Sequence, residues 1–481
     1  MTRKSASYLF LGMLALYFAY IIYQISQSAY AHSDDAWTLW HNPEPGVMLW
    51  YWGGMGRIFA GYVQQKLFSL VGVLENLKYI RLLACLGWMS CTALFYGLLN
   101  RSRLFDYWTT LLCVACFASS FFLLILVGWS AQVLSFIPAL LCLSAAPFLY
   151  GRKYIPLVLL MGITSLFFYQ VFYPYLLLPF YFSYLKNKDG KFTKPMLIGL
   201  FYFFLGLVIY FALWKLIMYE AGQHAHPRTA VEFHPLEKLG FFFSPPMNQA
   251  FNVSFFFNTG SAISQAVFPV LFAAWLAFEF LYRKNPWPVK IRYVLGLIVW
   301  WMIGYLPCLV AREDFGPYRS MAVLGPMVFV MMADIFATLV KGDVLKQRLT
   351  FLLTIILLVW GDYVYYAYLS HPLTEEYKAV RKEVTNRYTP NITKVVFVRA
   401  DEEGFLPHFG VHHYKDEFGM PSTYKDWTPE PLVKQIVYEM TGSREKADHL
   451  QVILYQKIDE IHDKKELADP NTLFIDAHTL F

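Results

Sequence analysis

Charged residues are scarce in this sequence. Asp, Glu, Lys and Arg make up 15% of its 481 residues, whereas soluble domains average about 25%. Cysteine is also rare, with six residues that all lie in apolar stretches, so we expect no disulfide framework. Gly-rich phosphate-binding motifs of the G-x-G-x-x-G or P-loop type are absent. Together with 57% hydrophobic residues, these absences exclude a soluble enzyme, a disordered scaffold and a nucleic-acid-binding module.

Long apolar runs are what the sequence has in abundance. A helix needs about 20 apolar residues to cross a bilayer, and the mean hydropathy of the chain is +0.40. We therefore predict an all-α polytopic membrane bundle. The clear spans are 7–25, 79–98, 105–127, 131–150, 195–218, 262–282, 293–311, 319–340 and 349–369.

The stretch 154–185 needs a separate interpretation. Basic residues flank both of its ends, which requires an even number of crossings, yet each arm has only about 15 residues. Pro174 interrupts the middle, so we predict two short spans or a re-entrant hairpin. Tyr169 and Gln170 at the break are candidate substrate contacts, and their alternative role is to satisfy the broken backbone. Counting two spans here gives about eleven.

Lys and Arg are concentrated in alternate loops, and this predicts the orientation. With the N-terminus in the cytoplasm, the inner side carries most of the basic residues of the membrane part. These are Arg3, Lys4, Arg101, Arg103, Arg152, Lys153, Lys186, Lys188, Lys191, Lys194, Arg283, Lys284, Lys290, Arg292, Lys341, Lys346 and Arg348. The chain is then N-in and C-out. A cleaved signal peptide ending at Ala29-Tyr30-Ala31 is the alternative, but an apolar core of about 19 residues favours an anchor.

The tail, residues 370–481, differs in composition from the membrane part. It carries 14 basic and 19 acidic residues, whereas residues 1–369 carry 26 and 15. Segments with helical spacing alternate with short β-like runs. These segments are 374–388, 395–398, 429–440, 452–455 and 473–475. We predict a transmembrane domain over 1–369 and a small, soluble, extracytoplasmic α/β domain over 370–481.

The first outer segment, residues 26–78, begins with an acidic pair, Asp34-Asp35, directly after the first span. A partly desolvated carboxylate has a raised pKa, and a neighbouring carboxylate raises it further, which suits general-base catalysis. Asp34 and Asp35 are therefore candidate catalytic residues, with a slight preference for Asp35 as the base. The alternative is a solvated helix cap, where Asp is also favoured.

Farther along this segment, the aromatic stretch from Trp50 to Lys66 predicts an amphipathic helix on the outer membrane interface. Arg57 is its only basic residue before Lys66. Arginine binds phosphate through two parallel hydrogen bonds and would neutralise a lipid-phosphate leaving group. The alternative for Arg57 is an ordinary anchor to lipid headgroups. Trp52 is a candidate substrate contact.

Two further outer regions carry candidate ligands. Arg312 and Arg319 flank a charged loop at helix ends, where a donor phosphate would lie, and loop salt bridges are the alternative. The outer loop 219–261 contains three histidines that are candidate ligands for a divalent metal ion. Without a Cys or carboxylate in register, surface histidines are favoured over a metal site there and in the tail. The histidines are His224, His226, His234, His408, His412 and His413.

The layout of one span, an acidic pair at its outer end and interfacial helices before the second span resembles the GT-C superfamily of lipid-linked glycosyltransferases. More narrowly, Asp34-Asp35, the stretch from Trp52 to Arg57 and the Tyr169-Gln170 break resemble the phage-type O-antigen glucosyltransferase (Gtr type II) family. The resemblance covers most of the membrane part. It implies transfer of a hexosyl unit, here glucosyl, from a polyprenyl-phosphate sugar to a hydroxyl of a cell-surface glycan or lipid.

The same resemblance implies an active site on the extracytoplasmic face of a bacterial inner membrane, an Asp base and an inverting displacement. The expected partners are the lipid-linked donor, the acceptor and membrane lipids, with no nucleic acid. A transporter or flippase for a lipid-linked saccharide is the alternative. It would place charged residues at mid-membrane, whereas Glu279 and Asp334 fall near inner ends of spans. A non-catalytic assembly partner acting through the tail is a third interpretation.

Overall fold

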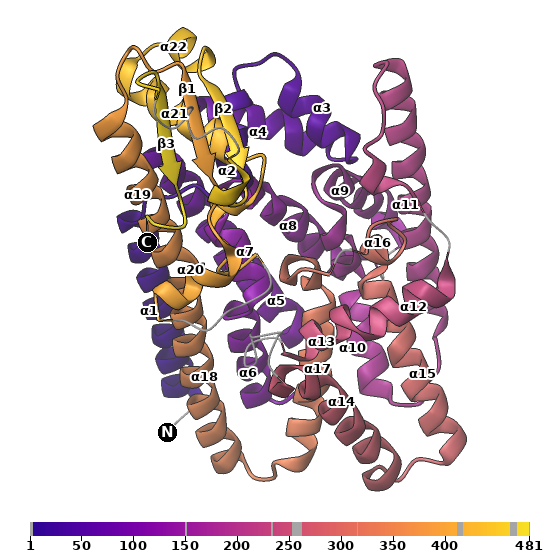
Figure 1. The fold of residues 1–481 in the computed structure, drawn as a ribbon. Helices are drawn as coiled ribbons and strands as arrows, with labels where there is room; N and C mark the ends of the chain where they lie inside the picture. Colours follow the sequence, from indigo (N-terminus) through magenta and orange to yellow (C-terminus); the bar gives the residue numbers. More distant parts are fainter. Residues whose placement is uncertain are drawn as a thin grey trace.

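The computed structural model describes residues 3–149, 152–231, 234–252, 262–314, 316–410, 417–461 and 469–480. Over these ranges the chain is mostly helical, with one small sheet in the tail (Figure 1). The α-helices are α1 (Arg3–Gln27), α2 (Asp34–His41), α3 (Val47–Gly54), α4 (Ile58–Val71), α5 (Leu77–Ser102), α6 (Tyr107–Ala118), α7 (Phe121–Gly128), α8 (Phe136–Ala145), α9 (Ile155–Phe168), α10 (Leu178–Asn187), α11 (Lys194–Glu220), α12 (Pro235–Phe243), α13 (Pro245–Asn252), α14 (Ala262–Ala277), α15 (Trp287–Gly304), α16 (Leu306–Leu309), α17 (Leu324–Leu339), α18 (Asp343–Tyr365), α19 (His371–Arg387), α20 (Glu402–His408), α21 (Pro429–Thr441) and α22 (Arg444–Asp448).

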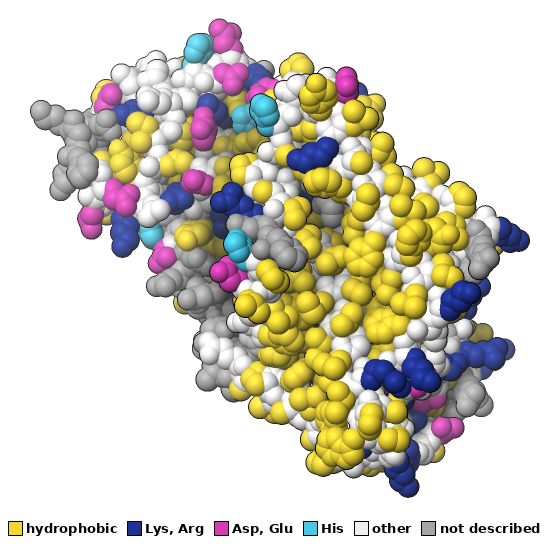
Figure 2. All heavy atoms as spheres, turned by 90° about the vertical axis from the view of Figure 1, so that its right-hand side faces the viewer, with side chains coloured by type: hydrophobic (Ala, Val, Ile, Leu, Met, Phe, Trp, Pro, Cys, Tyr) yellow, Lys and Arg dark blue, Asp and Glu magenta, His cyan; other side chains and the backbone are white. Residues whose placement is uncertain are grey.

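Seven helical segments are long and apolar enough to cross a membrane, and each overlaps an expected span. They are Lys4–Gln27, Leu74–Ser102, Tyr107–Gly128, Ser130–Phe148, Lys194–Glu220, Gln265–Tyr282 and Asp343–Arg387. The other expected spans coincide with α9, α10, α15 and α17, of which α9 and α17 are shorter apolar helices. Figure 2 shows a broad hydrophobic surface between two more polar ends. The structure thus has a helical bundle with several membrane-length helices, and the count of eleven remains a prediction.

The loops expected in the cytoplasm meet at one end of the bundle. Lys188 and Arg283 both pair with Asp334 near the end of α17. Lys346 at the start of α18 pairs with Asp106 before α6 at 2.6 Å. The N-terminus lies at this end in Figure 1, whereas the sheet of the tail lies at the opposite end. The arrangement agrees with an N-in, C-out orientation, which stays a prediction.

Two expected spans are broken. The span expected at 105–127 consists of α6 and α7, which are separated by two residues. In the stretch 154–185, α9 ends at Phe168 and the extended backbone of Tyr169 (φ −163°, ψ 115°) breaks the helix. A 3-10 turn, η5 (Gln170–Leu177), then contains Pro174 and leads into α10. The break expected around Tyr169 and Gln170 is therefore observed.

The expected interfacial helix between Trp50 and Lys66 is divided in two. α3 ends at Gly54 and α4 begins at Ile58, so a turn separates them. Gly56 in this turn has φ +79°, a left-handed conformation that favours glycine. Because the chain turns here, Arg57 lies immediately before α4 and not in the middle of a continuous helix.

The tail contains a parallel three-stranded sheet in the order β2-β1-β3, which confirms the small α/β tail expected from the sequence. The strands are β1 (Lys394–Val398), β2 (Gln451–Tyr455) and β3 (Thr472–Asp476). The central strand β1 is the most buried of the three, as its apolar run predicts. α18 continues through a π-turn, η9 (Tyr366–Ser370), into α19. The expected domain boundary at 369/370 therefore lies inside a continuous helical segment.

Candidate active site

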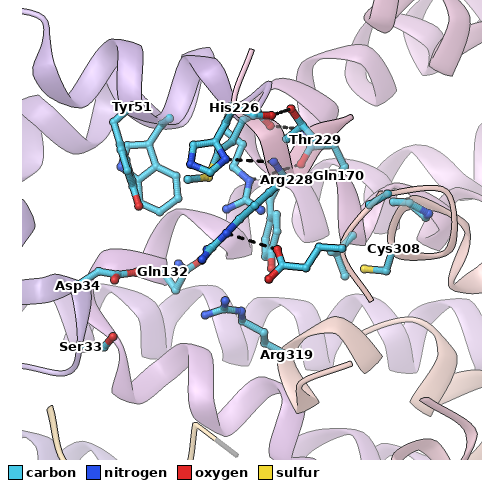
Figure 3. A pocket seen from close by; sticks show the side chains of 18 of the residues that line it. Ser33, Asp34, Tyr51, Gln132, Gln170, His226, Arg228, Thr229, Cys308 and Arg319 are labelled. Atoms are coloured by element: carbon cyan, nitrogen blue, oxygen red, sulfur yellow. Dashed lines mark hydrogen bonds and ion pairs between the residues drawn. The ribbon is translucent and has the colours of Figure 1, made fainter. Parts of the chain in front are cut away.

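A cavity of about 590 Å³ lies at the end of the bundle that carries α2, α3 and α4. Its wall combines segments that are far apart in sequence, including α2, the α3–α4 turn, the start of η5, the loops after α11 and before α17, and residues 417–428, here called the tail strap. Figure 3 shows part of this wall. Six of the eight residues expected at the site line it: Asp34, Trp52, Arg57, Tyr169, Gln170 and Arg319. The volume is typical of a small-molecule site.

Asp34 begins α2 and lines the cavity. Its Oδ1 accepts a hydrogen bond from Trp427 Nε1 at 2.9 Å. Burial raises the pKa of the Asp34 carboxyl above its usual value, although Arg319 and the bond from Trp427 oppose this shift. In Figure 3, Asp34 and Arg319 point toward one another. A carboxylate with a raised pKa at the cavity wall is suited to accept a proton from a bound hydroxyl.

Asp35 has different surroundings. It is 0% exposed and is not among the described residues that line the cavity. Its Oδ1 accepts from the backbone N–H of Ala131 at 2.6 Å, and its Oδ2 accepts from those of His32 at 3.0 Å and Ser130 at 3.4 Å. Burial raises the pKa of Asp35 to about 6, and Arg81 opposes the shift. Both carboxylate oxygens of Asp35 accept hydrogen bonds from backbone N–H groups. The geometry therefore favours Asp34 over Asp35 as a candidate base.

Arg57 enters the cavity between aromatic and neutral polar side chains. Its guanidinium carbon lies 4.1 Å from the centroid of the Tyr169 ring and 5.5 Å from that of Trp52. Its Nε donates to Gln170 Oε1 at 3.4 Å. Burial lowers the pKa of Arg57, and the positive charge of Arg319 lowers it further. Within the described chain no carboxylate forms an ion pair with Arg57, so its charge is available to an anionic ligand.

The α3–α4 turn that carries Arg57 is held from two sides. Gln170 Nε2 donates to Tyr210 Oη at 2.6 Å, and Tyr210 Oη donates to the carbonyl of Gly56 at 3.1 Å. Trp214 Nε1 donates to the carbonyl of Gly53 at 2.8 Å. The break at Tyr169 thus places Gln170 where it contacts both the turn and the guanidinium. This network fixes the position of Arg57.

Arg319 is the second cavity arginine expected from the sequence. Its Nη1 forms an ion pair with Glu417 of the tail strap at 2.7 Å, and its guanidinium lies 4.5 Å from the Trp129 ring centroid. The other expected arginine, Arg312, is exposed and is not among the described lining residues. Arg228, which the sequence interpretation missed, lines the cavity instead. The structure therefore brings Arg57 and Arg319 to the cavity, together with Arg228.

The tail strap closes one side of the cavity and is anchored to the first outer segment. Ser422 Oγ donates to the carbonyl of Ala31 at 2.5 Å. The buried carboxylate of Glu376 on α19 accepts from the backbone N–H groups of Ser422 at 2.8 Å and Thr423 at 2.9 Å. Burial raises the pKa of Glu376 to about 7, whereas these hydrogen bonds favour its charged form. The sequence interpretation gave the tail no role at the site.

Two buried N–H groups at the cavity lack partners. Trp52 and Trp129 are 4% and 3% exposed and line the cavity. Within the described part of the chain, neither Nε1 has a hydrogen-bond partner. A buried donor without a partner costs about 1–3 kcal/mol. Hydroxyl or phosphate oxygens of a bound ligand would satisfy both groups, so the cavity has the features of a binding site.

The histidines considered as metal ligands do not gather. His226 lines the cavity, whereas His224 is exposed to solvent. In the described ranges there is no group of three His, Cys, Asp or Glu residues placed to hold a metal ion. His412 and His413 lie outside the described residues.

The comparisons with known proteins give no assignment. No family model matches this chain, and no curated protein matches it. The features of this chain that bear on function are therefore the cavity and its charged and aromatic lining.

Proposed function

We propose that this protein is an integral membrane glycosyltransferase that uses a polyprenyl-phosphate sugar. It would transfer a hexosyl unit, which the family resemblance suggests is glucosyl, to a hydroxyl of a glycan or lipid at the outer face of the membrane. The observation that carries the proposal is a single cavity that brings the Asp34 carboxylate together with two half-buried arginines, Arg57 and Arg319. The transfer reaction needs a carboxylate to accept the proton of the hydroxyl and positive charge to stabilise the phosphate leaving group.

Asp34 supplies the base in this mechanism. As an acceptor hydroxyl attacks the anomeric carbon, its proton passes to the Asp34 carboxylate and the bond from that carbon to the phosphate oxygen breaks. A single displacement inverts the anomeric configuration. Burial raises the pKa of Asp34, which brings the carboxylate closer to the proton affinity that an effective base needs. The hydrogen bond from Trp427 orients Oδ1.

The arginines bind the phosphate of the donor. Arg57 and Arg319 are close enough that the positive charge of Arg319 lowers the pKa of Arg57. An anion bound between them would relieve this repulsion. The planar guanidinium group matches the spacing of phosphate oxygens. Two partly desolvated positive charges stabilise the leaving phosphate as negative charge develops on it. The Tyr169 and Trp52 rings beside Arg57 give the sugar and the first prenyl unit apolar contacts.

The transporter alternative is less favoured. Glu279 and Asp334, two of the four acidic residues that fall within expected spans, are both paired with Arg283 at the opposite end of the bundle. The Arg283–Asp334 pair joins the residue after η7 (Phe278–Tyr282) to α17, and none of these three residues is among the described residues that line the cavity. The charged residues that line the cavity, among them Asp34, Arg57 and Arg319, lie at the other end of the bundle, as a transfer reaction at one membrane surface requires.

Transfer of labelled sugar tests the proposal. Purified protein in nanodiscs is supplied with radiolabelled polyprenyl-phosphate glucose and a panel of glycan and lipid acceptors. We expect label in an acceptor, no transfer by Asp34→Asn, and a raised donor KM in Arg57→Ala and Arg319→Ala. Arg101→Ala, an exposed arginine at the end of α5, is the matched control. Full transfer by Asp34→Asn, or unchanged donor affinity in both cavity variants, would contradict the mechanism.

A further inference from the structure

Three aromatic side chains line the cavity together with Asp34, and each comes from a different element. Trp37 lies one helical turn after Asp34 on α2, Tyr51 is on α3 and Trp427 is in the tail strap. All three line the cavity. The rings of Trp37 and Tyr51 are 4.6 Å apart between centroids. Figure 3 shows Tyr51 on the same side of the cavity as Asp34.

Trp427 forms a hydrogen bond through the N–H edge of its indole, and part of its surface is exposed. Its Nε1 donates to Asp34 Oδ1 at 2.9 Å, yet the residue is 39% exposed. The ammonium of Lys425 lies 5.7 Å from its ring centroid. The indole therefore contacts the proposed base through its N–H group while much of its surface remains accessible from the cavity.

The two sides of the cavity differ in chemistry. The side with Arg57 and Tyr169 carries positive charge suited to a phosphate. The side with Asp34 carries aromatic rings and a carboxylate, and the charges of Arg319, Lys425 and Arg228 are near enough to lower the pKa of Asp34. The faces of a pyranose ring present C–H groups that pack on aromatic rings, while its hydroxyls form hydrogen bonds with carboxylates and indole N–H groups.

We propose that Trp37, Tyr51 and Trp427 form the acceptor subsite and that the acceptor is a saccharide. This inference rests on the proposed glycosyltransferase function. The acceptor ring packs between the tail strap and α2, and one of its hydroxyls lies against Asp34. The tail domain then supplies part of the acceptor wall and contributes to the choice of acceptor.

The binding part of this inference is tested with simple sugars. Saturation-transfer NMR is recorded on the full-length protein in nanodiscs with methyl glycosides of glucose, galactose, mannose and rhamnose. We expect saturation transfer to the ring protons of at least one glycoside. The signal should be lost in Trp427→Leu and Trp37→Leu and kept in Trp427→Phe, which retains an aromatic face without the N–H group. Trp287→Leu, at a 63% exposed tryptophan at the start of α15, is the matched control.

Kinetics separate this inference from the proposed function. In the transfer assay, Trp427→Leu should raise the acceptor KM about tenfold or more, as expected for a lost stacking contact, and leave the donor KM unchanged. Trp37→Leu, on a separate element, provides the same test if Trp427→Leu does not fold. Unchanged acceptor KM in both variants of an active enzyme overturns the subsite alone. Glycoside binding that depends on Trp427, in a protein that transfers no sugar, overturns the proposed function and supports the saccharide site.

Discussion

At the scale of single residues, Asp34 and Asp35 are neighbours with different surroundings. Successive residues of a helix point about 100° apart, so one carboxylate lines the cavity and the other is buried against the backbone of Ser130 and Ala131. We therefore expect Asp34 to react with a bound ligand and Asp35 to stabilise the local backbone.

Asparagine substitutions at the pair should separate catalysis from stability. Asp34→Asn should lower kcat by about 10²–10⁴-fold without changing unfolding. Asp35→Asn turns an amide NH₂ group toward backbone donors and should lower the free energy of unfolding by about 1–3 kcal/mol, while the folded fraction stays active. Unfolding is followed with a maleimide dye that reacts with the buried cysteines. Loss of catalysis in folded Asp35→Asn with full activity in Asp34→Asn would reverse the assignment.

The pH dependence of transfer should report on Asp34. Because burial raises its pKa, the rate should fall as the pH drops through a value above the usual range for Asp, where the base becomes protonated. Trp427→Phe removes a hydrogen bond to the charged form, so the acidic limb should move to higher pH by up to about one unit. An unchanged or lowered limb in this variant would contradict the role of Asp34. Trp287→Phe provides the control profile.

The sequence predicts which residues line the cavity better than how they are arranged. An acidic pair after the first span, Arg57 and the Tyr169-Gln170 break are all local patterns, and all contribute residues to the cavity. The contact between Asp34 and Trp427 joins positions 393 residues apart. No local periodicity encodes such a contact, because the fold of the whole chain brings the two residues together. The slight preference for Asp35 as the base could not take into account the hydrogen bond that Asp35 accepts from the backbone of Ala131, because this contact also joins distant parts of the chain.

At the scale of elements, the α3–α4 turn determines where Arg57 lies. A Cβ added at Gly56 would lie 2.0 Å from Tyr210 Oη and 2.8 Å from Gln170 Nε2, and its φ is +79°. A side chain here must displace the two groups that hold the turn. Gly53, in the same region, leaves 3.6 Å to its nearest neighbours.

Alanine at these two glycines makes a matched pair. Gly56→Ala should raise the donor KM by about tenfold or more, because Arg57 shifts, and should destabilise the fold by about 1 kcal/mol or more. Gly53→Ala should change both quantities little. Donor KM and dye-monitored unfolding measure the two effects. Equal behaviour of the two variants would show that the turn does not position Arg57.

One buried carboxylate, that of Glu376, attaches the tail strap to α19. Glu376 accepts from the backbone of Ser422 and Thr423 and from Thr423 Oγ1 at 2.7 Å. Glu376→Gln replaces one acceptor oxygen with a donor and should weaken docking of the strap by about 1–3 kcal/mol. Hydrogen exchange at 422–427 should then accelerate and kcat should fall, while exchange in the bundle stays unchanged. Glu375→Gln, at the exposed neighbouring glutamate, is the control. An unchanged exchange rate would contradict this anchoring role.

Most elements follow from the sequence, and the exceptions have physical causes. The tail strands and the helices α19 and α21 lie within a few residues of the predicted segments, because short apolar runs and amphipathic patterns are local signals. Apolar length located the spans but not the break between α6 and α7, since Ser119 and Ser120 are small and compatible with a continuous helix. The boundary at 369/370 followed composition, and the helix from α18 to α19 continues across it.

At the scale of the whole molecule, the two ends of the bundle differ in the residues that they carry. One end gathers ion-paired basic loops, among them Lys188 and Arg283 on Asp334. The other carries the α2–α4 region and the tail domain (Figure 1), and the cavity lies among them. Chemistry at one end of a membrane bundle fits transfer at one membrane face, and a saccharide carrier would have to move its cargo past both ends.

One measurement tests this account most directly. Protein is reconstituted in liposomes with radiolabelled polyprenyl-phosphate glucose and a water-soluble glycan acceptor, and label is counted in the glycan and in each leaflet. The account predicts label in the glycan, inverted at the anomeric carbon, and a loss of about 10²–10⁴-fold in Asp34→Asn. Label that moves between leaflets without reaching any acceptor, equally in wild type and Asp34→Asn, would contradict it.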